Sequence, residues 1–355
     1  MKKSCILISI ILLLCFLTAS CSAGSESALT INDTAEVNTE IFTYFLNDAY
    51  YSGSYETEDQ CVDAATSKCL EYMAVNTRFA QMGNKLSQND KADIALEVNS
   101  LWRSYGAYFT ELGISKDTYF KIKQYEYCKE ALRFSLYDTD GETPIAETYI
   151  EQYFTSNYVG IKYFYEELYT AVSDSEYEAL SETEQLIYDA EKEAAEERYQ
   201  SISEIADYVN SGVYSIDEAF MAVTGEISAD ISVSATVVGR SDSSFSSDFI
   251  EAVFKQTVGS AFIITNSDHS YLYFIERVDL LSDEYDFYDE YRDACLKAVS
   301  ESYFVSEINT WVQSCSTVRH MSAVNGCLNA VTSIDRSKYA GTDEYVFKSL
   351  QYSEE

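Results

Sequence analysis

Few residues in this chain have the type and spacing that acid–base or nucleophilic chemistry requires. Histidine is the most frequent general base in such sites, and the 355 residues include only two, His269 and His320. His320 follows Arg319 and has no second metal ligand at a suitable spacing, so we expect it to be a surface residue. No serine, cysteine or aspartate is paired with a plausible base. We therefore expect neither a metal nor another cofactor.

Cys21 is the residue with the clearest chemical role. It follows Thr18-Ala19-Ser20, an apolar stretch over residues 6–17, and lysines at positions 2 and 3. Residues 1–20 therefore resemble a bacterial lipoprotein signal peptide, with cleavage before Cys21 and a diacylglycerol on its thiol. The alternative is an ordinary secretory signal with an incidental cysteine. With residues 21–27 as a short tether, we expect a lipid-anchored protein on the extracytoplasmic face of a bacterial cell membrane.

Six further cysteines follow Cys21. In an oxidising compartment they could form three disulfides, in any of fifteen connectivities. Their spacings match no CxxC motif, and several lie on predicted apolar helix faces, where a free thiol packs as a small apolar group. We favour mostly buried free thiols. The six residues are Cys61, Cys69, Cys128, Cys295, Cys315 and Cys327.

The composition is strongly acidic and also rich in apolar residues. The formal net charge is −35, yet 46% of the residues are hydrophobic and 14% are aromatic. That apolar content excludes a disordered acidic tail, and the scarcity of Lys and Arg disfavours a nucleic-acid partner. The 31 tyrosines and 18 phenylalanines suit the binding of polypeptides, because a tyrosine offers an apolar ring and a polar hydroxyl.

Residues 28–157 predict a mainly helical region. Two short strands flank a turn at Asn32-Asp33, and Asn38 is a typical helix cap. The clearest helix ends at Gly113 and carries one apolar stripe with a period of 3.6 residues, which we interpret as core packing. That stripe consists of Ile94, Val98, Leu101, Trp102, Tyr105, Tyr108, Phe109 and Leu112.

Residues 158–280 predict a mixture of strands and helices, and residues 281–355 return to helix with a polar tail. Ser181 and Glu184 form a capping box at the start of a long acidic helix that ends near Asn210. The order of elements is typical of an α+β domain. Strands are expected at residues 159–165, 231–238, 261–264 and 271–275.

This organisation resembles the extracytoplasmic foldases of the PrsA/SurA type, over nearly the whole mature chain. The opening through Ile31-Asn32-Asp33, the helical region, the small α+β domain and the closing helix carry the resemblance. The most specific match, from Phe249 through Tyr273, is similar to the last helix, turn and two strands of a parvulin. The resemblance implies a helical SurA-like chaperone domain, formed by residues 28–157 and 281–355. A small parvulin-like α+β domain, residues 158–280, would be inserted in it.

The resemblance also implies a location for the site. A parvulin surrounds its substrate proline with two histidines, one on the first strand and one on the last. Tyr163 and Tyr273 stand at the corresponding positions of this chain, and His269 precedes the last strand. As contacts for a bound peptide, the resemblance implies Phe249, Phe254 and Phe262.

The function implied is that of a membrane-anchored chaperone or foldase that assists the folding of secreted proteins. Its partners would be unfolded or nascent polypeptides, and its parvulin-like domain would lack full activity because both histidines are replaced. One alternative is an active peptidyl-prolyl cis-trans isomerase in which the tyrosine hydroxyls serve the reaction. The other is a structural or assembly lipoprotein that binds one specific partner. The sequence predicts no particular oligomeric state.

Overall fold

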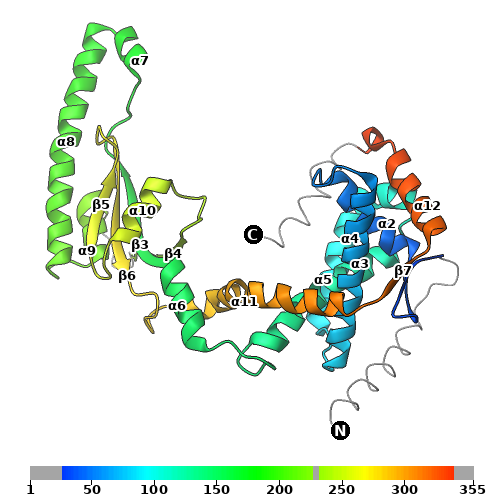
Figure 1. Cartoon of the computed structure of the whole chain (residues 1–355). Coiled ribbons are helices and arrows are strands. Elements are labelled where there is room, and N and C mark those ends of the chain that lie inside the picture. Colours follow the sequence, from blue (N-terminus) through cyan, green and yellow to red (C-terminus); the bar gives the residue numbers. More distant parts are fainter. Residues whose placement is uncertain (1–25, 227–231, 340–355) are drawn as a thin grey trace. The chain divides into compact units, whose positions relative to one another are not determined.

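The computed structural model describes residues 26–226 and 232–339 (Figure 1). The signal peptide, Cys21 and the end of the polar tail lie outside these residues. Two compact units are present: one takes the chain up to Ile145 and from Ser300 onward, and the other is Ala146–Val299. Both contain helices and a small antiparallel sheet, so the α+β class is confirmed. The second unit begins before and ends after the expected segment 158–280.

The first unit is mostly helical. Its sheet has the order β2-β1-β7, so a strand close to the end of the described chain pairs with the first strand. The hairpin turn between β1 and β2 places Asn32 and Asp33 at φ of 51° and 61°, the left-handed conformation that a tight turn needs. The elements are β1 (Ser27–Ile31), β2 (Ala35–Asn38), α2 (Thr39–Tyr51), α3 (Glu58–Gln81), α4 (Gln88–Glu111), α5 (Lys116–Tyr137), the C-terminal part of α11 (Phe287–Gln313), β7 (Thr317–Arg319), α12 (Met321–Ser333) and a 3-10 turn at Arg336–Lys338.

Aromatic rings fill the core of the first unit. Phe109, on the predicted stripe of α4, is buried and stacks on Tyr119 of α5 with ring centroids 4.9 Å apart. The indole of Trp102 stacks on the Phe109 ring, with centroids 6.0 Å apart. The stripe therefore packs in the core, as predicted. Asn38 caps α2 as predicted, because its side-chain oxygen accepts the N–H of Ile41 at 3.0 Å.

The second unit is built on a four-stranded antiparallel sheet of order β4-β3-β6-β5. Ser181 and Glu184 form the predicted capping box of α8. Strand β4 is shorter than expected, since residues 232–234 are not in a strand. The elements are α6 (Glu147–Asn157), β3 (Tyr158–Glu167), α7 (Asp174–Ala179), α8 (Glu182–Asn210), α9 (Ile216–Thr224), β4 (Ala235–Gly239), α10 (Ser247–Lys255), β5 (Ala261–Thr265), β6 (Tyr271–Val278) and the N-terminal part of α11.

Helices pack on both faces of this sheet. Successive side chains of a strand point to opposite faces, so each strand contributes to both cores. On one face, Phe164 and Phe274 form a core with residues of α8 and α9, such as Ile202 and Ala219. On the other face, the core contains Ile161, Ile275 and residues of the much shorter α10. Because α10 is much shorter than α8, it leaves part of this second face exposed. The candidate site lies on that exposed part.

Candidate functional site

Strands β3 and β6 bring the two tyrosines at the predicted site positions together. Tyr163 lies opposite Ile275, and Tyr165 lies opposite Tyr273. Because positions two apart share a face, Tyr163, Tyr165, Tyr271 and Tyr273 all lie on the α10 side of the sheet. The rings of Tyr163 and Tyr273 are 6.2 Å apart between centroids, and those of Tyr165 and Tyr273 are 5.3 Å apart. We call these four residues the aromatic face.

Helix α10 packs against part of the aromatic face. Phe249 is only 2% exposed, and its ring centroid lies 5.1 Å from that of Tyr273 and 6.4 Å from that of Tyr163. The Ser246 hydroxyl accepts the N–H of Phe249 at 3.2 Å, which fixes the first turn of α10. Phe249 was expected to contact a bound peptide. Phe249 is instead buried, and its ring packs against the rings of Tyr163 and Tyr273.

The other two predicted contact residues are half-buried at the margin of the same core. Phe254 packs against the core, and the Arg240 guanidinium lies over its ring, 4.1 Å from the centroid. Phe262 of β5 lies opposite Ile275. Both rings keep some exposed surface.

Phe245 belongs to this cluster and was missed in the sequence. It lies in the loop before α10 and stacks on Phe249 with centroids 4.3 Å apart, and it meets the Tyr163 ring edge-on at 5.6 Å. Tyr165 and Tyr271 were missed as well. The alternation Tyr163-x-Tyr165 and Tyr271-x-Tyr273 was the available signal, since it places two tyrosines on one side of each strand.

The chemistry open to the aromatic face is binding. Within residues 26–226 and 232–339, the hydroxyls of Tyr163 and Tyr273 have no hydrogen-bond partner, so each can donate to a ligand carbonyl. Contacting aromatic pairs have centroids about 4.5–7 Å apart, and the rings of Tyr163, Tyr273 and Phe249 all fall in that range. The three rings therefore pack against one another.

Neither histidine lies on the aromatic face. His269 is in the turn between β5 and β6, stacked on Tyr199 of α8 with centroids 3.9 Å apart. Its Nδ1 is 2.5 Å from Glu196, also on α8, the helix that covers the opposite face of the sheet. His320 is in the first unit, exposed as expected, with Nε2 2.8 Å from the Thr30 hydroxyl.

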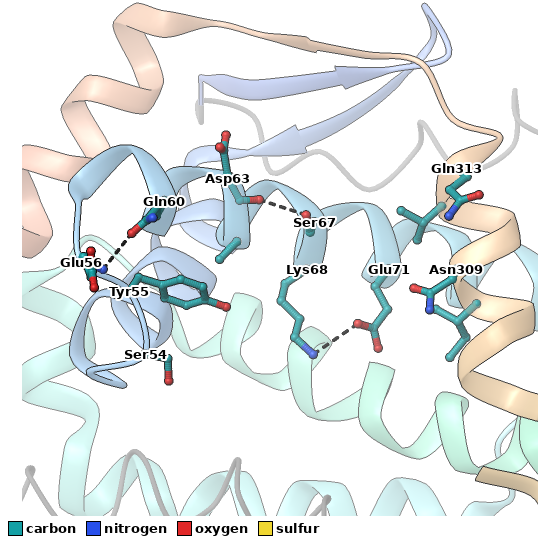
Figure 2. A pocket seen from close by; sticks show the side chains of 13 residues that line it. Ser54, Tyr55, Glu56, Gln60, Asp63, Ser67, Lys68, Glu71, Asn309 and Gln313 are labelled. Carbon is teal, nitrogen blue, oxygen red and sulfur yellow. Dashed lines mark hydrogen bonds and ion pairs between the residues drawn. The ribbon is translucent and has the colours of Figure 1, made fainter. Parts of the chain in front are cut away.

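The first unit contains a groove of about 870 Å³ (Figure 2). It is lined by the loop before α3, by α3 and by the C-terminal part of α11. Asn309 and Gln313 of α11 carry side-chain amides across from Lys68 and Glu71 of α3, as Figure 2 shows, while Val312 adds apolar surface. In the part of the chain that the structure describes, neither amide has a hydrogen-bond partner, so both can bond to a peptide backbone.

All six described cysteines are free thiols, and five of them are buried; Cys315 is partly exposed. Burial raises the pKa of Cys128 and of Cys295 to about 11, and that of Cys69 well above its ordinary value. Because the thiolate is the reactive form, these three are unsuited to nucleophilic chemistry.

In the described ranges, no group of three or more His, Cys, Asp and Glu side chains is placed to hold a metal ion. Among the described residues, no helix is both long enough and apolar enough to cross a membrane.

These features define a class: an α+β protein with a small antiparallel sheet that presents an aromatic face, and with a helical unit built from both ends of the described chain. No protein-family model matches the chain, and no curated protein matches it.

Three solved structures to which the chain is similar are foldase proteins PrsA, the kind of protein that the sequence resembles. For PrsA of Lactococcus lactis the identity is 14% and the TM-score 0.37, over 86% of this chain and 99% of that one. For Streptococcus pneumoniae the values are 13%, 0.31, 84% and 96%. For Bacillus subtilis they are 14%, 0.25, 77% and 85%. At these identities the likeness concerns the fold alone, and with TM-scores this low we transfer no residue role or activity from it.

Proposed function

We propose that this chain is a lipid-anchored extracytoplasmic foldase that holds unfolded segments of secreted polypeptides on its aromatic face. The observation that carries the proposal is the exposure of neighbouring rings on one side of the sheet. Tyr165 is 49% exposed, and Tyr163, Tyr271 and Tyr273 are half-buried beside it. Unfolded chains expose apolar side chains and unpaired backbone carbonyls, and a tyrosine can bind both.

The groove of the first unit supports the same function. Side-chain amides such as those of Asn309 and Gln313 bond to any peptide backbone, so they suit a protein with varied clients. The tether and the acylated Cys21 would hold the protein close to chains as they leave the membrane.

Suppression of aggregation tests the proposal. The chain from residue 21, made soluble by Cys21→Ser, should reduce the light scattering of a proline-free unfolded client at equimolar ratio. Tyr165→Ser should weaken that effect several-fold, because it removes the most exposed ring of the aromatic face. Tyr208→Ser is the matched control, since Tyr208 is 46% exposed in the same unit but lies on α8. Unchanged client aggregation with the parent chain, or equal losses in both variants, would refute the proposed binding surface.

The lipid anchor has its own test. In a bacterial host, the full chain should incorporate a radiolabelled fatty acid and sediment with membranes. Cys21→Ser should abolish the label and release the protein. Labelling that survives the substitution would show that Cys21 is not the acylated residue.

An active isomerase is the second candidate, favoured by one observation: the hydroxyls of Tyr163 and Tyr273 are unpartnered and carried by adjacent rings. Isomerisation must lower a barrier of about 18–20 kcal/mol. Because tyrosines stand where a parvulin carries its two histidines, we favour binding. A protease-coupled prolyl-peptide assay decides. A measurable rate that is lost in Tyr273→Phe would establish the isomerase.

A further inference from the structure

Residues 170–194 form an arm that projects from the second unit. In Figure 1, α7 and the first half of α8 extend past the ends of strands β3, β5 and β6. Tyr169 is 6% exposed and Ala195 is 3% exposed, and between them every residue is exposed or only partly buried. The arm therefore contributes nothing to the two cores of the sheet, although it takes up 25 residues of this chain.

The arm has contacts of its own between α7 and α8. The hydroxyl of Tyr177 on α7 donates to both carboxylate oxygens of Asp189 on α8, at 3.1 and 3.0 Å. The Gln185 side chain donates to the backbone carbonyl of Tyr177 at 3.0 Å. The rings of Tyr177 and Tyr188 meet at 5.5 Å. Such contacts hold α7 against α8 and keep the outer surface of α8 in one place.

That outer surface carries an unpartnered apolar stripe. Leu186 is 71% exposed and Ile187 is 55% exposed. With Ala190 and Ala194, also exposed, they follow the spacing i, i+1, i+4 and i+8, which puts all four on one side of the helix. The residues of α8 that pack on the sheet, such as Ile202, lie on another side. Burying Leu186 and Ile187 against a partner would recover the hydrophobic free energy that the isolated chain forgoes.

Acidic side chains line this stripe. At 100° per residue, Glu182 and Glu193 flank it on one side and Glu191 on the other. In residues 170–194 there are eight acidic residues and one basic residue, Lys192. A second copy of this chain would bring acidic residues against acidic residues, and an anionic membrane surface would be repelled. A positively charged partner meets complementary charge.

We propose that the stripe of Leu186, Ile187, Ala190 and Ala194 is a docking surface for a cationic amphipathic segment of a partner polypeptide. Such a segment has apolar side chains along one side and lysines or arginines beside them. Its apolar side chains cover the stripe, and its charges meet Glu182, Glu191 and Glu193. This surface is separate from the aromatic face and does not require the proposed foldase function.

A defined peptide tests the docking surface. The probe is a fluorescent helical peptide of about 18 residues, five helical turns, with leucines on one side and lysines on the other. Its binding to the Cys21→Ser chain is measured by anisotropy at low and at high salt. Leu186→Ser with Ile187→Ser should weaken binding at least about tenfold, because two aliphatic contacts are lost. The control is Leu96→Ser with Val258→Ser, two residues exposed by 69% and 57% elsewhere, which should bind as the parent does.

A second pair of variants separates specific docking from the general attraction of an acidic protein. Glu182→Gln with Glu193→Gln should weaken binding and reduce its salt dependence. Glu204→Gln with Asp207→Asn removes the same charge from exposed positions further along α8 and should have a much smaller effect. Circular dichroism confirms that each variant is folded. A peptide with glutamates in place of lysines should not bind.

Three results would overturn the proposal. The first is equal loss of affinity in the arm variants and their controls. The second is a concentration-dependent dimer in sedimentation that Leu186→Ser with Ile187→Ser abolishes, because the stripe would then be a self-association surface. The third is binding to phosphatidylglycerol vesicles that depends on Leu186 and Ile187 while the lysine peptide does not bind.

Discussion

At the scale of single residues, ion pairs and hydrogen bonds decide how this acidic protein tolerates buried charge. Lys123 is 2% exposed, and its ammonium lies 3.0 Å from Glu97 and 2.9 Å from Glu126. Burial by itself would lower the pKa of Lys123, but the carboxylate of Glu126 and the neighbouring Tyr119 outweigh it and raise that pKa above its ordinary value. A buried charged side chain of this kind stabilises the fold only while its ion-pair partners keep their charge.

Glu71 offers the clearest test. Burial alone would raise its pKa, but the ammonium groups of Lys129 and Lys68 and a hydrogen bond from Tyr125 lower the pKa to about 2. Because the folded-state pKa lies below the unfolded one, this carboxylate stabilises the fold above about pH 4.5, and the contribution is lost as the pH falls towards 2. Glu71→Gln should lower the free energy of unfolding by about 2–3 kcal/mol at pH 7.

Urea unfolding at pH 7 and at pH 3 measures the effect, and the difference between the parent and Glu71→Gln should shrink at the lower pH. Glu56→Gln is the control, since Glu56 is exposed and its carboxylate belongs to no ion pair among the described residues. A pH-independent difference for Glu71→Gln would mean that the shape of the side chain matters and its charge does not.

At the scale of elements, close backbone approach determines how β3 pairs with β6. Gly160 lies opposite Val278 in this pair. A Cβ at Gly160 would come within 2.8 Å of Val278 Cγ2 and 3.1 Å of its carbonyl oxygen. A strand residue with a side chain therefore does not fit at this position without a shift of β6.

Two glycine substitutions of the same chemistry should have opposite effects. Gly160→Ala should destabilise the second unit by roughly 1–3 kcal/mol, because the added methyl overpacks the sheet. Gly326→Ala should stabilise the protein by about 0.5–1 kcal/mol, because Gly326 is inside α12 and an added Cβ would meet no atom within 4 Å. Thermal unfolding of both variants provides the comparison. Stabilisation by Gly160→Ala would contradict the close packing of β3 on β6.

At the scale of the whole molecule, the cysteines are distributed over both units and form no disulfide within the described residues. Cys295 belongs to the second unit and the other five belong to the first. Their burial, where it occurs, removes both access and thiolate character. In the described residues, each unit is held together by apolar and aromatic packing.

Alkylation should show this directly. In the native Cys21→Ser chain, iodoacetamide should modify Cys315 first, because it is the partly exposed thiol of the six. The other five should react only after denaturation in urea, which is also the control for complete labelling. Intact-mass spectrometry counts the modified thiols. Fast modification of Cys69 or Cys295 in the native protein would contradict their burial.

Part of the candidate site could be predicted, because the resemblance to a parvulin implied Tyr163 on the first strand and Tyr273 on the last. Tyr163 and Tyr273 each lie at a fixed place in an apolar strand, and the pairing of β3 with β6 puts their rings together. The burial of Phe249 and the contribution of Phe245 depend on how α10 docks on the sheet, which local sequence does not specify. The groove was not predicted either, because Lys68 and Asn309 are separated by most of the chain.

The sequence alone determined the features that arise within a few residues: the cap at Asn38, the capping box at Ser181, the core stripe of α4 and the α+β class. These follow from side-chain hydrogen bonds and periodicity, which need no distant partner. Only the tertiary structure decided that β7 pairs with β1 and that the stripe at Leu186 is left uncovered. Both depend on contacts between residues far apart in the chain, and whether such contacts form is settled by the packing of the whole unit.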